Sequence, residues 1–179
     1  GPGYGLPVPY LGTFGEINVR LYSRDGDGRR GVVFRSLEAT RLAVVLGTNL
    51  AGVPYRFSRI GIADDGVVLG YASTRLAPPH RGADTDFAVR RGSRDRSDDA
   101  LAVFLTARWG MHTAVAGRPI YVPNTHRRWP LYDADVVRLR DDLVAAAGLP
   151  GVANRPPDSV LWSPGVRTQF GRPFGVTPA

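Results

Sequence analysis

The chain contains no cysteine and no lysine among its 179 residues, and each absence removes a class of chemistry. Without cysteine there is no disulfide, no thiolate nucleophile and no cysteine-ligated zinc site. Without lysine no side chain carries a primary amine, so all 23 basic residues are arginine. The lack of cysteine leaves the redox compartment undetermined.

Long apolar runs are also missing. No segment approaches the ~20 apolar residues that a membrane-spanning helix needs, and the chain does not open with the charged and apolar regions of a secretion signal. The sequence therefore predicts no membrane partner, and the cytoplasm is the default expectation. With 43% hydrophobic and 22% charged residues the composition is that of a globular protein, and residues 1–179 predict a single domain.

The formal net charge of +7 raises the question of nucleic-acid binding. The arginines are dispersed, however, and the densest group, residues 90–99, mixes four arginines with three aspartates. A surface that tracks phosphates needs basic residues on one face with aromatic platforms between them. We therefore expect a solvated charged surface, and nucleic-acid association is kept only as a second alternative. The all-arginine composition, with abundant alanine, glycine, proline and valine, is typical of GC-rich codon usage.

Alternating and turn-forming residues predict most of the strands. In residues 14–24, Ile17, Val19 and Leu21 share one face, which is the periodicity of a strand. Residues 25–28 read Asp-Gly-Asp-Gly, a strong turn signal, so residues 31–37 form the return strand of a hairpin. Residues 55–63 and 67–74 are expected to form two more strands, joined at Asp64-Asp65-Gly66 in another hairpin. Further strands are expected at 84–91, within 111–122 and in 159–170.

Capping residues predict about three helices. The first covers 37–50 with Ser36 as its N-cap and Glu38 in its first turn, and the second opens at residues 97–99 and runs to about Arg108. The third is capped by Asp133 or Asp135 and closes at residues 148–150, which read Gly-Leu-Pro. Together these elements predict an α+β domain, dominated by antiparallel strands that curl towards a barrel or cone.

The polar face of the strand at 14–24 is the first candidate site. Glu16, Asn18 and Arg20, continued by Tyr22, supply a carboxylate, an amide and a guanidinium close together. If this face points inward, the set could bind an anionic or carbonyl ligand and move a proton. The simpler alternative is that this face is exposed to solvent, since polar residues that point outward are the commonest strand pattern.

The other motifs give little evidence for a functional site. His80, His112 and His126 match no metal motif in their spacing, so no metal site is predicted, and a structural role is expected for them. No Gly-x-Ser-x-Gly elbow supports a Ser-His-acid triad. No phosphate-binding or dinucleotide loop is present either, so no cofactor is expected.

Several segments in collinear order resemble one bacterial family. They are Phe14–Tyr22, Gly31–Phe34, Ser36–Ala39, Pro54-Tyr55, Phe104–Thr106 with Arg108, His126 with Trp129–Leu131, and Ser163–Val166. The chain is similar in these segments to the YqjF-like proteins, a family of unknown function. The chain departs from the family pattern at Ala107, where the family usually has an acid. By this resemblance we also expect the family's opening strands to be missing from the residues given.

The resemblance implies a fold and a pocket. The family is thought to share the fold of acetoacetate decarboxylase, a curled antiparallel barrel or cone around a central pocket. That enzyme forms a Schiff base through a lysine, whose counterpart here falls near Thr48-Asn49, and neither residue can form an imine. Schiff-base decarboxylation is therefore excluded. Glu16 resembles the acidic pocket residue of the corresponding strand, which favours an inward-facing strand.

These arguments lead to a small-molecule pocket protein as the first hypothesis. We expect an enzyme that does lyase, dehydratase, isomerase or cyclase chemistry on a carbonyl or carboxylate compound, with Glu16 and Arg20 as catalytic residues. The expected ligand-binding residues are Asn18, Tyr22, Ser36, Asn49 and His126. The alternative is a binding barrel without catalysis. Assembly into a homo-oligomer stays open.

Overall fold

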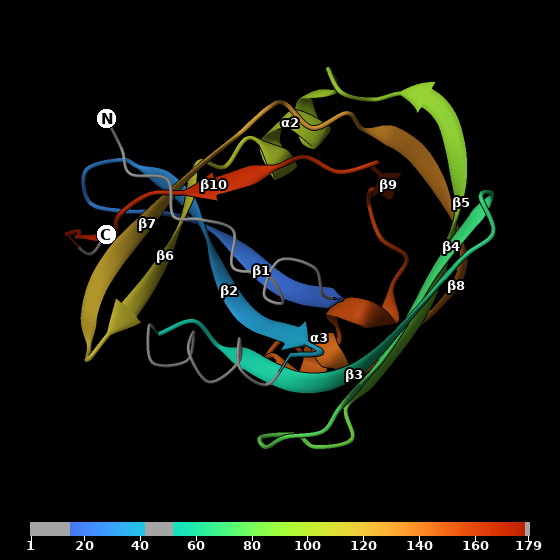
Figure 1. Ribbon diagram of the computed structural model, residues 1–179, viewed down its shortest axis with the longest axis horizontal. Helices are drawn as coiled ribbons and strands as arrows, with labels where there is room; N and C mark the ends of the chain where they lie inside the picture. The colour runs from blue at the N-terminus through green and yellow to red at the C-terminus, as the bar shows by residue number, and fades with distance from the viewer. Residues whose placement is uncertain (1–14, 42–51, 178–179) are drawn as a thin grey trace.

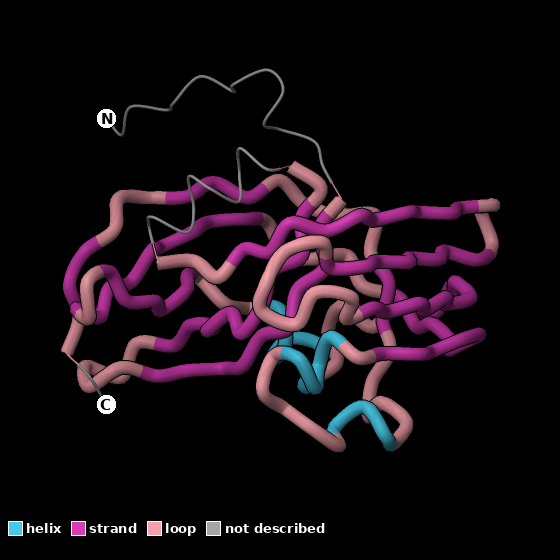
Figure 2. Tube along the Cα trace, turned by 90° about the horizontal axis from the view of Figure 1, so that it is seen from below, coloured by secondary structure: helices cyan, strands magenta, loops and turns pink. Residues whose placement is uncertain are grey.

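The computed structural model describes residues 15–41 and 52–177 (Figure 1). The strands are β1 (Glu16–Arg24), β2 (Arg30–Ala39), β3 (Tyr55–Asp64), β4 (Val68–Arg75), β5 (Asp84–Asp95), β6 (Gly110–Val115), β7 (Arg118–His126), β8 (Tyr132–Asp141), β9 (Leu161–Trp162), β10 (Thr168–Phe170) and β11 (Phe174–Gly175). The helices of this part of the chain are α2 (Ala100–Thr106), α3 (Leu143–Ala146) and the 3-10 helix η1 (Val152–Asn154). Strands dominate, and Figure 2 shows the helical segments gathered at the lower edge of the molecule.

Strand β2 is the centre of a single mixed sheet. Along one edge it pairs antiparallel with β1 over its whole length. Its other edge is shared, because its last residues pair in parallel with β3 and Val32 pairs in parallel with Met111 of β6. Two wings therefore start from β2. One wing runs β3-β4-β5-β8-β9, and the other runs β6-β7 with β10 and β11 along β7.

The sheet curls but does not close. Figure 1 shows β5 and β8 facing β6 and β7 across β1 and β2. Among the described residues, the hydrogen-bonded path ends at β9 on one wing and at β10 on the other. The sequence-based prediction of a mainly antiparallel, curled sheet is therefore confirmed at this coarser level, with two parallel pairings at β2 added.

Aspartates and glycines form the predicted hairpin turns. In the β1–β2 turn, the Asp25 carboxylate accepts the backbone N–H of Arg29, and Gly28 takes a positive φ of 83° that suits glycine. In the β3–β4 turn, the Asp65 carboxylate accepts the backbone N–H groups of Val67 and Val68. Both hairpins confirm the prediction from sequence.

The second predicted helix is confirmed and the other two are corrected. Asp99 caps α2, since its carboxylate accepts the N–H groups of Leu101 and Ala102. Ser36 does not cap a helix, because residues up to Ala39 belong to β2; the rest of the predicted segment, residues 42–51, lies outside the described residues. Residues 132–141 form strand β8 in place of the third helix, and only the four residues of α3 are helical.

A buried ion pair ties β2 to the β3–β4 wing. The side chains of Glu38 and Arg75 are each 1% exposed. Arg75 donates to both carboxylate oxygens of Glu38, at 2.6 and 3.1 Å, and the hydroxyl groups of Ser36 and Ser58 also donate to this carboxylate. Arg75 donates in addition to the carbonyl of Pro79. Every charge of the pair thus has a partner, which a buried pair needs in order to be tolerated.

The described part of the chain contains no helix long and apolar enough to cross a membrane.

Candidate functional site

The concave side of the curled sheet encloses a cavity of about 1510 Å³. Strand β2 and both wings contribute apolar side chains to its lining, among them Phe34, Leu69, Phe87, Val89, Met111 and Val122. A cavity of this size and character suits the apolar body of a small organic ligand. Polar side chains come from β1, from the segment that follows α2, from β7 and β8, and from the C-terminal segment.

Strand β1 presents its polar face to this cavity. Glu16, Asn18, Arg20 and Tyr22 all line it, as alternate residues of one strand must when one of them does. The alternative, in which this face points outward into solvent, is therefore not the arrangement found. Asn18 and Arg20 remain exposed because the cavity is wide and open to solvent.

At one end of β1, Glu16 is hydrogen-bonded to a tyrosine. The Tyr55 hydroxyl donates to the Glu16 carboxylate over 2.7 Å, and the Asn18 amide lies 3.4 Å from the other carboxylate oxygen. Burial raises the pKa of Tyr55, and the negative charge and hydrogen bond of Glu16 raise it further. Tyr55 therefore stays protonated and acts as a donor to Glu16.

At the other end of β1, two guanidinium groups gather around Tyr22. Arg20 donates to the backbone carbonyl of Leu105 over 3.2 Å, and the Tyr22 hydroxyl donates to the same carbonyl. The Arg108 guanidinium carbon lies 4.2 Å from the Phe104 ring centroid and 5.1 Å from that of Tyr22. Ring faces of this kind attract a cation but do not neutralise its charge.

Arg108 is a buried cation without an acidic partner among the described residues. The residue is 9% exposed, its Nε atom has no hydrogen-bond partner, and Nη1 donates only to the neighbouring Ala107 carbonyl. Burial lowers the pKa of Arg108, and the nearby charges of Arg30 and Arg20 add to this. A buried charge without a counter-charge is costly, so the geometry leaves a place for an anion.

The cavity is thus polarised along β1. Glu16 and Arg20 are four residues apart, which separates their Cα atoms by roughly 13 Å in a strand. They form no ion pair, because each is engaged by a different neighbour: Glu16 by Tyr55, Arg20 by the Leu105 carbonyl. The structure has an acidic end and a cationic end.

His126 and Asn124 of β7 also line the cavity. The His126 Nδ1 atom lies 2.7 Å from the carbonyl of Arg127, so Nδ1 carries the proton and donates it there. The His126 ring stacks on Trp109. The side-chain oxygen of Asn124 is buried and has no hydrogen-bond partner in the described structure.

Ser36 faces away from the cavity because β2 contains a bulge. The β1–β2 register passes from Ser36 to Phe34 and leaves Arg35 without an opposite residue. The cavity-facing positions of β2 therefore shift from Val32 and Phe34 to Leu37. Ser36 instead belongs to the buried network around Glu38 and Arg75. Asn49, the other predicted ligand-binding residue not found in the cavity, lies outside the described residues.

A Ser-His-acid chain does occur, but on the opposite face of β1. The Ser23 hydroxyl lies 2.8 Å from His112 Nδ1, and His112 Nε2 lies 3.4 Å from the Asp25 carboxylate. Asp25 is already paired with Arg29 at 2.6 Å. Since these residues do not line the cavity, the arrangement supports the hairpin.

The described residues contain no group of three or more potential metal ligands close enough to hold an ion. The sequence analysis missed the roles of Tyr55, Arg108 and Asn124. Tyr55 and Arg108 lie in segments that carry the family resemblance, and that was the one signal pointing to them.

Residues 1–167 match the model of the family DUF2071, described as an uncharacterized conserved protein. The match covers most of the chain, so the protein belongs to this family, and the YqjF-like resemblance is confirmed. Comparisons with curated proteins and with solved structures returned no match.

Proposed function

We propose that the protein binds a small organic anion with an apolar body in the cavity, with the anionic group on Arg108 and Arg20. The observation that carries this proposal is Arg108, a buried guanidinium in the cavity wall whose Nε atom has no partner. A carboxylate would accept two parallel hydrogen bonds from such a group. The apolar lining would take up the rest of the ligand.

The acidic end of the cavity supports a catalytic form of this proposal. Glu16 lines the same cavity and accepts a 2.7 Å hydrogen bond from Tyr55. A carboxylate held in this way can remove a proton next to a carbonyl, with Tyr55 as a neutral donor beside it. The corresponding reactions are the lyase, dehydratase, isomerase or cyclase steps of a carbonyl compound. In the alternative, a protein that binds its ligand without catalysis, Arg108 and Arg20 hold the anionic group and Glu16 has no chemical role.

The curled sheet also fits the finer proposal of an acetoacetate decarboxylase-like cone. The cavity on its concave side and the inward face of β1 support that proposal. The Schiff-base mechanism of that enzyme is not available to this protein, because the chain has no lysine.

Calorimetry with decanoate and decanol tests the binding proposal, because the two probes share a chain length and differ in charge. We expect decanoate to bind more tightly, and Arg108→Gln to weaken its binding by about 10- to 100-fold, since it removes hydrogen bonds to a charged group. Arg118→Gln is the matched control, because Arg118 is exposed at the start of β7 and does not line the cavity. Equal binding of the two probes, or equal binding by both variants, would overturn the proposal.

Proton exchange tests the catalytic form. A derivative of decanoate with a keto group near the far end of its chain places the protons next to that carbonyl towards Glu16 when the carboxylate lies on Arg108. These protons exchange in heavy water, which NMR can follow. We expect the protein to accelerate this exchange and Glu16→Gln to remove about 10²- to 10⁴-fold of the rate. If the ligand binds but wild type and Glu16→Gln exchange at the same rate, the protein is a binding module.

A further inference from the structure

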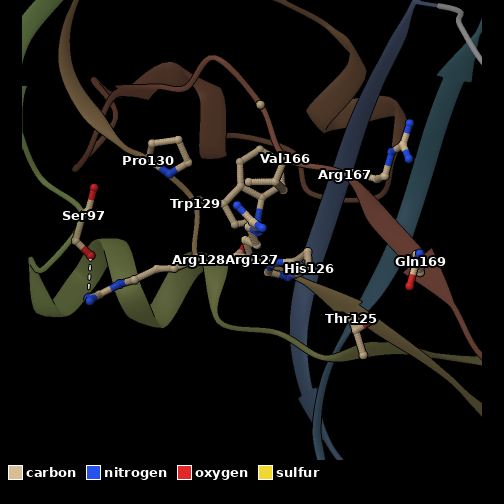
Figure 3. Close-up of a pocket in the computed structure, with 11 residues that line it drawn as sticks. Ser97, Thr125, His126, Arg127, Arg128, Trp129, Pro130, Val166, Arg167 and Gln169 are labelled. Atoms are coloured by element: carbon tan, nitrogen blue, oxygen red, sulfur yellow. Dashed lines mark hydrogen bonds between the residues drawn. The ribbon is translucent and has the colours of Figure 1, made fainter.

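A second pocket, of about 880 Å³, lies over the pairing of β7 with β10 (Figure 3). The end of β7, the segment that follows it and the residues just before β10 supply most of its wall. His126, Arg127, Arg128 and Arg167 all line it, and no lining residue is acidic. Three arginines and a histidine thus line one depression in the surface.

Two of the three arginines are free to bind a ligand. Arg128 is engaged, because it pairs with Asp98 and donates to the carbonyl of Ser97 at 2.8 Å. The side chains of Arg127 and Arg167 have no acidic or hydrogen-bond partner within residues 15–41 and 52–177. Figure 3 shows Arg128 reaching towards Ser97 on one side of the pocket and Arg167 on the other, with Arg127 between them.

Neutral polar groups complete the wall. Thr125 and Gln169 stand opposite each other in the β7–β10 register, so both side chains come to the pocket at one level. His126 donates from Nδ1 to the Arg127 carbonyl, which leaves Nε2 for a ligand. Trp129 adds an aromatic surface. Guanidinium groups with hydroxyl and amide groups beside them form a typical phosphate-binding set.

We infer that this pocket binds the phosphate group of a phosphorylated small molecule. His126 and Trp129 line both this pocket and the large cavity, so the two sites share a wall. The phosphate can therefore belong to the same ligand that places its acid group on Arg108, or to a separate molecule. The first case rests on the proposed function, whereas the second does not.

Calorimetry with phenyl phosphate at constant ionic strength tests the inference. Its ring can contact Trp129 while its phosphate reaches the arginines. We expect binding to wild type and a loss of about 10- to 100-fold in Arg127→Gln/Arg167→Gln, because charged hydrogen bonds are removed. The double variant Arg59→Gln/Arg118→Gln is the control, since it removes the same charge from two exposed residues elsewhere on the sheet.

Repeating the phenyl phosphate titration with saturating decanoate shows whether the phosphate group belongs to the cavity ligand or to a separate molecule. Competition indicates one ligand across the shared wall, and independent binding indicates two molecules; both outcomes support the phosphate site. Absence of phenyl phosphate binding, or equal loss in both double variants, overturns it. Binding of a single-stranded oligonucleotide that both double variants weaken equally would likewise overturn the phosphate-site proposal. The arginines would then belong to a diffuse basic surface and not to a specific pocket. None of these outcomes depends on Arg108, so failure here leaves the decanoate test intact.

Discussion

Arg108 shows at the scale of one residue why the cavity is more than a packing defect. Its guanidinium is buried against Tyr22 and Phe104, yet no acid among the described residues neutralises it. Folding selects against an unpaired buried charge, so a protein that keeps one has accepted a cost in stability. Residues that lower stability in this way are commonly found at functional sites.

The first prediction separates the role of Arg108 in binding from a role in folding. We expect Arg108→Gln to change the free energy of unfolding by less than about 1 kcal/mol, because the relief of a buried charge offsets the lost ring contacts. Urea denaturation measures this directly. A loss of more than about 3 kcal/mol would show that the residue supports the fold, as buried, paired charges do.

The second prediction concerns the pKa of Tyr55, which burial and Glu16 raise above its usual value of 10.0. A folded-state pKa above the unfolded value means that the folded state keeps its proton longer. This contribution to stability is complete below pH 10 and declines as the pH rises towards the folded-state pKa. We expect wild type to lose stability above about pH 10 and Tyr55→Phe to lose less there. Parallel melting curves from pH 8 to 11 for both proteins would contradict this.

At the scale of the element, β2 carries most of what local patterns could not predict. Alternation and turn residues predicted β1, β3, β4 and both of their hairpins, because those signals lie within a few residues. The β2 bulge has no such local signal, and it turns Ser36 from the cavity to the opposite face. Glu38 resembled an acid in a helix first turn, because its partner Arg75 is 37 residues away.

Strand β8 is a second element that local sequence patterns did not predict. Asp133 and Asp135, followed by the apolar residues of the same strand, fit a capped helix when the segment is considered alone. The strand is stabilised by its neighbour, since Arg138 and Arg140 pair with Asp86 and Asp84 of β5. Cross-strand pairs of this kind cannot be predicted from a single segment.

The third prediction tests the buried pair of β2. We expect Arg75→Met to lower the free energy of unfolding by about 3–5 kcal/mol, because it leaves Glu38 charged and buried. The double variant Glu38→Leu/Arg75→Met should recover much of this loss, since both charges are then removed. The exposed pair Arg138–Asp86 is the control, and Arg138→Met should cost at most about 1 kcal/mol. Equal losses in the two single variants would argue against a special role for β2.

At the scale of the whole molecule, the open curl of the sheet creates a cavity with a carboxylate at one end of β1 and two guanidinium groups at the other. The family resemblance predicted a central pocket and an inward Glu16 from sequence. It did not predict the polarity, because Tyr55, Leu105 and Arg108 meet β1 only through the fold. That polarity favours one orientation for an anionic ligand, since Glu16 repels the group that Arg108 attracts.

The most direct test is a crystal structure of the protein with an ω-bromo derivative of decanoate. The bromine gives an anomalous signal that marks the far end of the chain independently of the carboxylate. We expect the carboxylate within about 2.7–3.1 Å of the Arg108 guanidinium and the bromine in the apolar part of the cavity. A ligand bound outside the cavity, or one with its carboxylate beside Glu16, would contradict the account.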